Sequence, residues 1–104
     1  MPRRLRRSRQ VIFDLTDHYR YLRTNDANTG ERFLDAAESM FRTLGDMPGI
    51  GRLWTSGDPR LTRIRVIHLP APFDRHLVFY REDKTRVRIL RVLHGARDLG
   101  SMLE

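Results

Sequence analysis

Hydrophobic positions in the first part of the chain recur at helical spacing. Between residues 9 and 24, apolar side chains fall at i, i+3, i+7 and i+10, which places them on one face of a helix. The members of this face are Ile12, Leu15, Tyr19 and Leu22. On this pattern Asp14, Asp17 and Arg20 face water, and Ser8 can cap the start of the helix. The sequence therefore predicts a first amphipathic helix over 9–24.

A second helix follows after a short polar turn at 24–28. Asn28 and Glu31 have the spacing of a capping box, so we expect this helix to begin at Asn28. Its apolar face contains Phe33, Ala37, Met40, Phe41 and Leu44. Gly45 and then Met-Pro-Gly at 47–49 end it. Two helices joined by so short a turn form an antiparallel hairpin.

The second half of the chain carries strand patterns. Residues 48–60 are rich in Gly and Pro, which predicts a long loop without regular structure. Runs rich in β-branched and aromatic residues follow at 61–69, 75–81 and 86–93, with short polar or Pro-containing connections. Short connections of this kind make an antiparallel meander.

The two ends of the chain complete the predicted domain. Residues 2–7 form either a short strand with Leu5 pointing inward or a disordered arginine arm, and the helix that follows at once favours the strand. Leu99 and Leu103, at i and i+4, indicate a short C-terminal helical turn. We expect one α+β domain over 1–104, with the helical hairpin packed on one face of an antiparallel sheet and the other face exposed.

Composition narrows the possible partners and compartment. The formal charge is +7, and every basic residue except Lys84 is an arginine, so the surface attracts polyanions or acidic proteins. The absence of cysteine excludes disulfides and thiolate metal sites. No apolar run approaches the roughly 20 residues of a spanning helix, and the basic start of the chain lacks a secretory apolar segment. We expect a cytoplasmic protein without a membrane partner.

Arginines on the predicted strands are candidate binding residues. Strand alternation puts Arg63 and Arg65 on one face and likewise pairs Arg86 with Arg88. Arg81 and Arg91 lie near strand ends, at 81 and 91. A basic binding surface on the free face of the sheet follows, and a merely solvated face is the alternative.

Histidines and Trp54 allow two interpretations each. His94 follows the last strand, where it acts either as a general acid or as a hydrogen-bonded structural residue. With His68 and His76 it forms no spacing typical of a metal site, so we expect no metal. No phosphate loop or serine nucleophile context is present, and we expect no cofactor. Trp54 either anchors a partner or folds its loop onto the core.

The order of elements and several motifs together resemble the RelE/ParE toxin superfamily. The likeness is strongest in Leu77–Arg81 and in Val87–Leu99, which contains His94-Gly-Ala-Arg97-Asp98. Met47–Arg52 is similar to the family's Pro-x-x-Gly loop, and Asp14-Leu15 with Tyr19 supports the match in the first helix. The resemblance implies the toxin of a type II toxin–antitoxin pair with the fold described above.

Two activities occur in this superfamily, and the resemblance leaves a choice between them. RelE-like members cleave mRNA in the ribosome, a role in which His94, Arg97, Arg81 and Arg65 would be the catalytic residues. The place of their C-terminal Tyr falls at Ser101 or Met102, and their lysines in the second helix and loop are missing. The resemblance therefore favours the ParE-like activity, inhibition of DNA gyrase without catalysis.

The resemblance also implies a protein partner. A cognate antitoxin, with an acidic C-terminal segment carrying apolar anchors, would wrap the toxin in a hetero-oligomer. The residues expected to bind antitoxin or target are Arg63, Arg65, Arg81, Arg91, Trp54 and Arg97. A third hypothesis is a nucleic-acid-binding module that uses the arm Arg3–Arg9.

Overall fold

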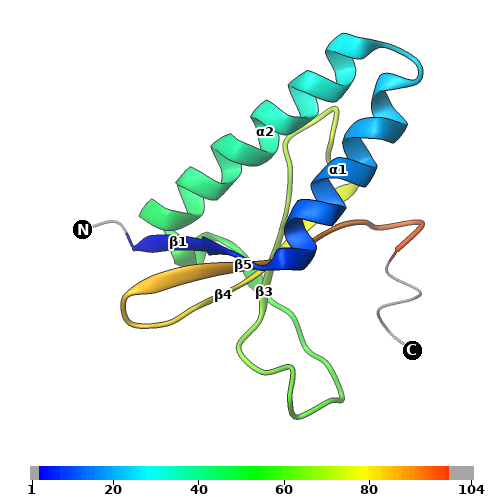
Figure 1. Cartoon of the computed structure of the whole chain (residues 1–104). Helices are drawn as coiled ribbons and strands as arrows, with labels where there is room; N and C mark the ends of the chain where they lie inside the picture. The colour runs from blue at the N-terminus through cyan, green and yellow to red at the C-terminus, as the bar shows by residue number, and fades with distance from the viewer. Residues whose placement is uncertain (1–2, 99–104) are drawn as a thin grey trace.

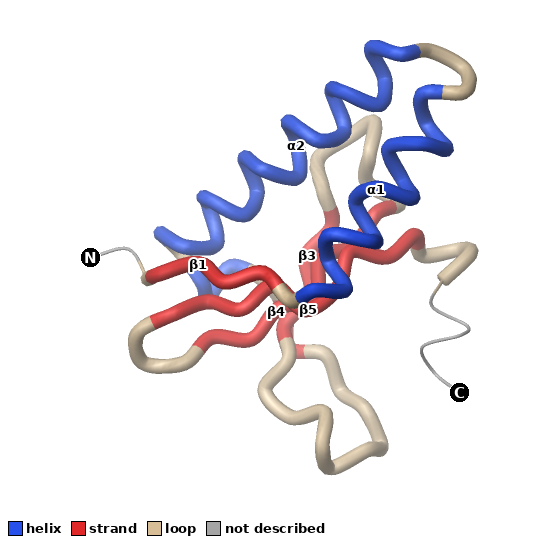
Figure 2. Tube along the Cα trace, in the orientation of Figure 1, coloured by secondary structure: helices blue, strands red, loops and turns tan. Residues whose placement is uncertain are grey.

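A five-stranded sheet carries a helical hairpin on one face (Figures 1 and 2). The computed structural model describes residues 3–98. Its elements in chain order are β1 (Arg4–Arg7), α1 (Arg9–Arg23), α2 (Ala27–Asp46), the 3-10 turn η1 (Pro48–Ile50), β2 (Arg52–Leu53), β3 (Arg65–His68), β4 (His76–Glu82) and β5 (Arg86–His94). The strand order in the sheet is β1-β5-β4-β3-β2. This α+β arrangement agrees with the fold class that the sequence predicts.

The sheet is mixed, which corrects the prediction of an antiparallel sheet. β1 pairs with β5 in parallel, whereas the other neighbours are antiparallel. A parallel pair needs a long crossover between its strands, and here the helical hairpin and three intervening strands supply it. The first strand of the chain thus lies beside the last one (Figure 1).

The helix starts agree only partly with the capping predictions. Ser8 caps α1 as expected, since its Oγ accepts a hydrogen bond from the Val11 N–H at 3.3 Å. The capping box predicted at Asn28 is wrong. Asp26 caps α2 instead, accepting from the Asn28 N–H at 2.9 Å. Aspartate is an equally good cap, and its extended backbone leaves Ala27 as the first helical residue.

The Gly- and Pro-rich segment is more regular than predicted, and the strand after it is shorter. Residues 48–53 form η1 and then β2, which pairs with β3. The strand expected from 61 begins only at Arg65. Arg63 explains this, because its φ of 58° lies in the left-handed region, which interrupts a strand. The long loop therefore runs from Trp54 to Ile64. The Trp54 N–H donates a hydrogen bond to the Ile64 carbonyl at 2.8 Å, which joins the two ends of the loop.

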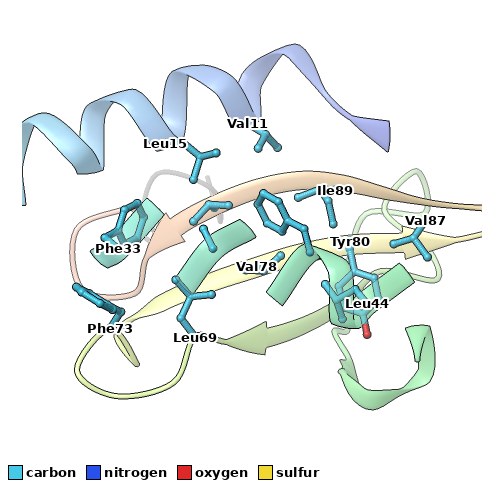
Figure 3. Close-up of a cluster of buried hydrophobic side chains, with 13 residues drawn as sticks. Val11, Leu15, Phe33, Leu44, Leu69, Phe73, Val78, Tyr80, Val87 and Ile89 are labelled. Carbon is cyan, nitrogen blue, oxygen red and sulfur yellow. The ribbon is translucent and has the colours of Figure 1, made fainter. Parts of the chain in front are cut away.

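Two apolar clusters lie on opposite faces of the sheet. The main core joins the helices to the sheet and includes Val11, Phe33, Leu44, Val78, Tyr80, Val87 and Ile89 (Figure 3). Phe41 belongs to the same cluster. The second cluster consists of Ile64, Val66, Phe79 and Leu93, with Trp54, Leu61, Leu77 and Leu90 packed against it. The long loop thus covers part of the face that the sequence predicted to be exposed.

The buried face of α1 differs from the predicted one. Ile12 is 58% exposed, and the residues that α1 buries are Val11, Asp14, Leu15 and His18. The prediction that Asp14 faces water is wrong, whereas Asp17 and Arg20 are exposed as expected. The helical turn predicted around Leu99 and Leu103 lies outside the described residues.

Candidate functional site

The hydrogen-bonding edge of β5 is only half covered by β1. The parallel pairing ends at Arg7 and Ile89. Ser8 extends it with two further bonds, from its backbone N–H to the Ile89 carbonyl at 3.0 Å and from its Oγ to the Leu90 carbonyl at 2.8 Å. Beyond Leu90 the edge of β5 needs other partners, because buried backbone groups without partners are costly.

Two polar side chains of α1 supply those partners. The Val92 N–H donates to Asp14 Oδ2 at 3.0 Å, and His18 Nε2 donates to the Val92 carbonyl at 2.8 Å. Asp14 and His18 are four residues apart, so they lie on the same side of the helix. Both side chains are at least 94% buried, as Asp14 is 6% and His18 3% exposed. In effect α1 continues the sheet where β1 stops.

Asp14 also holds an arginine. Arg91 donates to it twice, from Nε at 2.9 Å and from a terminal nitrogen at 3.0 Å. The hydrogen bond to Asp14 raises the pKa of Arg91. This pair lies in a polar cleft of about 400 Å³ between α1 and the end of β5. The cleft is lined by Gln10, Asp14, Asp17, His18, Arg91, Leu93, Arg97 and Asp98.

The turn after β5 is fastened to the same cleft. The His94 N–H donates to Asp98 Oδ2 at 2.8 Å, and Arg97 donates to His18 Nδ1 at 3.1 Å. Arg97 also lies over the Tyr21 ring at 4.7 Å. Because the Val92 carbonyl can only accept and Arg97 can only donate, Nε2 of His18 is the donor and Nδ1 the acceptor in these contacts.

Three histidine rings pack edge-to-face beside the cleft. The His76 ring lies edge-on to His18 at 4.8 Å and to His94 at 5.2 Å between ring centres. Burial lowers the pKa of His76 to about 4, and the neighbouring rings add to this. Burial also lowers the pKa of His94. Nδ1 of His76 and of His94 has no hydrogen-bond partner within residues 3–98. The arrangement suits neutral rings that pack.

A metal site does not emerge from these histidines. Among the described residues, no three His, Asp or Glu side chains are placed to hold a metal ion together. The same part of the chain holds no helix that is long and apolar enough to cross a membrane.

The arginines predicted on β3 have other positions than expected. Arg63 is exposed in the loop, and the face predicted to be shared with Arg65 is not formed. Arg65 lies opposite Tyr80, on the helix side of the sheet. It donates to the Gly51 carbonyl at 2.7 Å, and its Nε lies 3.7 Å from a Glu82 oxygen.

The residues of the alternative catalytic set do not gather at one place. Arg81 pairs with Arg88 across the sheet, and its Nε donates to the Thr62 carbonyl at 3.1 Å. His94 pairs with His76, five residues along β4 from Arg81, a separation of about 16 Å along a strand. His94 and Arg97 lie near each other at one end of the sheet, whereas Arg65 pairs with Tyr80, next to Arg81, and points to the opposite face from Arg81.

Trp54 packs within the molecule. It is half-buried, and its ring meets Phe79 edge-on at 5.6 Å between ring centres. It thereby closes the second cluster under the long loop.

Five arginines share the face of the sheet that points away from the helices. They form what we call the arginine ladder: Arg4 and Arg6 on β1, Arg86 and Arg88 on β5, and Arg81 on β4. The register pairs Arg4 with Arg86 and places Arg6, Arg88 and Arg81 side by side. Strand alternation predicts the positions of Arg86 and Arg88, but Arg4 and Arg6 join them only through the parallel pairing of β1.

An apolar hollow of about 200 Å³ lies on the opposite side, on the helical hairpin. We call it the hairpin groove. It is lined by Arg7, Ile12, Leu15, Thr16, Tyr19 and Leu34. Ile12, one of the lining residues, is 58% exposed.

Comparison with known proteins gives the family. The structure is similar to a chain of the chromosomal ParDE TA system from P. aeruginosa, with a TM-score of 0.71 and 16% sequence identity over 88% of this chain and 95% of that chain. At this identity the likeness shows the fold. No curated protein matches the sequence significantly. The family model described as "ParE toxin of type II toxin-antitoxin system, parDE" matches residues 5–99. Because this match spans nearly the whole sequence, the chain belongs to the ParE toxin family of type II toxin–antitoxin systems.

Proposed function

We propose that this chain is a toxin that inhibits DNA gyrase by binding it and that a cognate antitoxin neutralises it. The family match over residues 5–99 carries the toxin role. The separation of Arg65 and Arg81 from His94 supports binding over RNA cleavage, because general acid–base catalysis needs its groups within hydrogen-bond reach of one substrate.

The apolar lining of the hairpin groove suits the apolar anchors of the antitoxin. It offers exposed Ile12 beside Leu15 and Leu34, the arrangement by which one amphipathic segment docks on another. The net charge of +7 attracts an acidic segment to the toxin. Arg91 and Arg65 are poor candidates for new ion pairs, since Asp14 and Glu82 already lie against them.

A supercoiling assay tests the target. Relaxed plasmid, gyrase and ATP are combined with increasing amounts of the purified chain, and we expect supercoiling to stop and to recover when antitoxin is added. Unchanged supercoiling at a large excess of toxin would refute the gyrase proposal.

Expression of the chain in bacteria separates gyrase inhibition from the alternative of mRNA cleavage in the ribosome. Gyrase inhibition leads to filamentous cells with a DNA-damage response. A rapid stop of translation, with cleaved mRNA and loss of cleavage in His94→Ala and Arg97→Ala, would favour the endonuclease instead.

Two neighbouring substitutions test the docking of the antitoxin. Ile12→Glu places a charge in the hairpin groove and should abolish rescue by co-expressed antitoxin while toxicity persists. Phe13→Glu is the matched control, because Phe13 is 57% exposed on the same helix but does not line the groove. Equal rescue of both variants would contradict docking in the groove.

A further inference from the structure

The arginine ladder is a regular array of positive charge. Arg6, Arg88 and Arg81 occupy neighbouring strands, so their Cα atoms are about 5 Å apart from strand to strand. Arg4 and Arg86 form a second row, two residues along, at about 6.7 Å from the first. The array rests on paired backbones, so its spacing is fixed by the sheet.

Few carboxylates among residues 3–98 lie close enough to neutralise this array. Arg86 pairs with Asp83 at 3.1 Å in an exposed contact, and Arg81 donates to a backbone carbonyl. Arg4, Arg6 and Arg88 have no carboxylate partner within residues 3–98. Like charges at this separation repel one another, so an anion across the ladder is stabilised by several of them at once.

The surroundings of the ladder indicate which anion fits. Two shallow hollows on it are lined by Arg4, Arg6, Arg7, Thr85, Arg86 and Arg88. Neither hollow has an apolar or aromatic lining residue. A protein partner would need apolar contacts at the centre of its interface, and single-stranded nucleic acid would need aromatic side chains to stack on. Duplex phosphates require only charge, and the arginine fork matches phosphate well.

We propose that the arginine ladder binds the phosphate backbone of duplex DNA without sequence preference. The choice of DNA over an RNA duplex rests on the proposed gyrase target, since gyrase holds DNA when an inhibitor reaches it. The five ladder arginines lie on the sheet face opposite the helical hairpin, and Arg7, at the edge formed by β1, lines both a ladder hollow and the hairpin groove. The apolar residues of the groove, Ile12, Leu15 and Leu34, therefore stay free for the antitoxin when the toxin is bound to DNA.

Salt dependence gives the proposal a magnitude. Five phosphate contacts predict a slope of log K against log salt of about −4.5, and affinity falls about 500-fold between roughly 50 and 200 mM salt. With three arginines removed, the slope is about −1.8 and the same change in salt costs about 12-fold.

The experiment uses the purified full-length chain and a short fluorescent DNA duplex of mixed sequence. The triple variant Arg4→Gln, Arg6→Gln, Arg88→Gln is compared with a control that removes three exposed helix arginines, Arg20→Gln, Arg32→Gln, Arg42→Gln. Each set of three changes lowers the formal charge from +7 to +4. We expect the slope to fall by about 2.7 in the ladder variant and to stay near the parent value in the control.

Further measurements keep the proposal falsifiable. The ladder variant with Lys in place of Gln should retain the slope, and thermal unfolding of each variant checks that the fold is intact. Equal losses in ladder and control variants would overturn the proposal, because net charge alone would then attract DNA. Tighter binding of polyglutamate, or of an RNA duplex of the same sequence, would also overturn it. Supercoiling inhibition is measured separately, so failure to bind DNA is distinguishable from failure to inhibit gyrase.

Discussion

Asp14, which is buried, should contribute more to the stability of the fold than Asp17, the other acidic residue of α1. Asp14→Ala removes the acceptor of the Val92 N–H and both hydrogen bonds from Arg91. The alanine side chain cannot reach the edge of β5, and α1 then lies over an unpaired backbone donor. Asp14→Asn keeps one acceptor oxygen for Val92 and loses the charge.

The expected cost follows from what each partner loses. The buried Val92 N–H, left without an acceptor, costs about 1–3 kcal/mol. The Arg91 side chain is 35% exposed and rehydrates, so loss of its pair adds about 1 kcal/mol or less. Asp14→Ala should therefore lower the free energy of unfolding by about 1–4 kcal/mol, equivalent to a fall in Tm of roughly 4–30 °C for a domain of this size. Asp14→Asn should cost about 1 kcal/mol.

Urea unfolding followed by circular dichroism measures these differences. Asp17→Ala is the matched control. It removes the same charge from the same cleft, but the Asp17 side chain is exposed. It should change stability by no more than about 0.5 kcal/mol. Equal losses for Asp14→Ala and Asp17→Ala would refute the idea that α1 completes the sheet edge.

Other predictions concern the packing around the sheet. The pKa of His76 in the folded protein is about 4, below its ordinary value of 6.5. As the pH falls, the unfolded chain therefore binds a proton at this residue before the folded chain does. The free energy of unfolding should accordingly fall between pH 6.5 and pH 4, by up to about 3 kcal/mol. Urea titrations at both pH values should show a smaller loss in His76→Leu. Tyr80→Phe removes the hydroxyl that accepts from the Gly51 N–H at 2.8 Å and should cost about 1–3 kcal/mol in the same assay. Gly51→Ala puts a Cβ 2.5 Å from that hydroxyl and should destabilise strongly, whereas Gly49→Ala, with nothing within 4 Å, should not. Trp54→Ala opens the second cluster and should cost about 2–3 kcal/mol, seen as a lower Tm; an unchanged Tm would contradict its structural role.

Local patterns predict the helices and the meander well. The spacing of apolar residues predicts α1 within one residue at its end, and Ser8 marks its start. β4 and β5 lie within one residue of the predicted runs. These elements are set by periodicity and caps, which are properties of neighbouring residues.

Strand pairing depends on residues far apart in the chain. Alternation gives the face on which Arg4 and Arg6 lie, but not that Arg86 and Arg88 are their neighbours. The sequence therefore predicts a basic surface from two pairs, Arg63 with Arg65 and Arg86 with Arg88. In the structure the second pair is joined by arginines of β1, and the first pair is not formed. The left-handed backbone of Arg63 likewise has no signature in its own side chain.

The burial of Asp14 and His18 could not be predicted from the sequence for a related reason. Its sequence allows two apolar faces, one through Ile12 and one through Val11, and the second carries Asp14 and His18. The periodicity alone favours the first face, because packing that face against a core buries no polar group. The second becomes favourable only when a strand edge needs a donor and an acceptor at that place. Two polar residues at i and i+4 within an apolar stripe are the signal that could have revealed this.

The C-terminal motif that carries the family resemblance contacts the same polar residues of α1 that complete the edge of β5. Within His94-Gly-Ala-Arg97-Asp98, Asp98 accepts from the His94 N–H and Arg97 donates to His18. Asp98 thus closes the turn after β5, and Arg97 fastens that turn to α1, so both residues have a structural role in this chain. A loss of toxicity in Arg97→Ala is evidence for a direct role in target binding only if the free energy of unfolding is unchanged. We expect Arg97→Ala to lower the free energy of unfolding, because His18 Nδ1 at the rim of the cleft would lose the hydrogen bond that Arg97 donates to it.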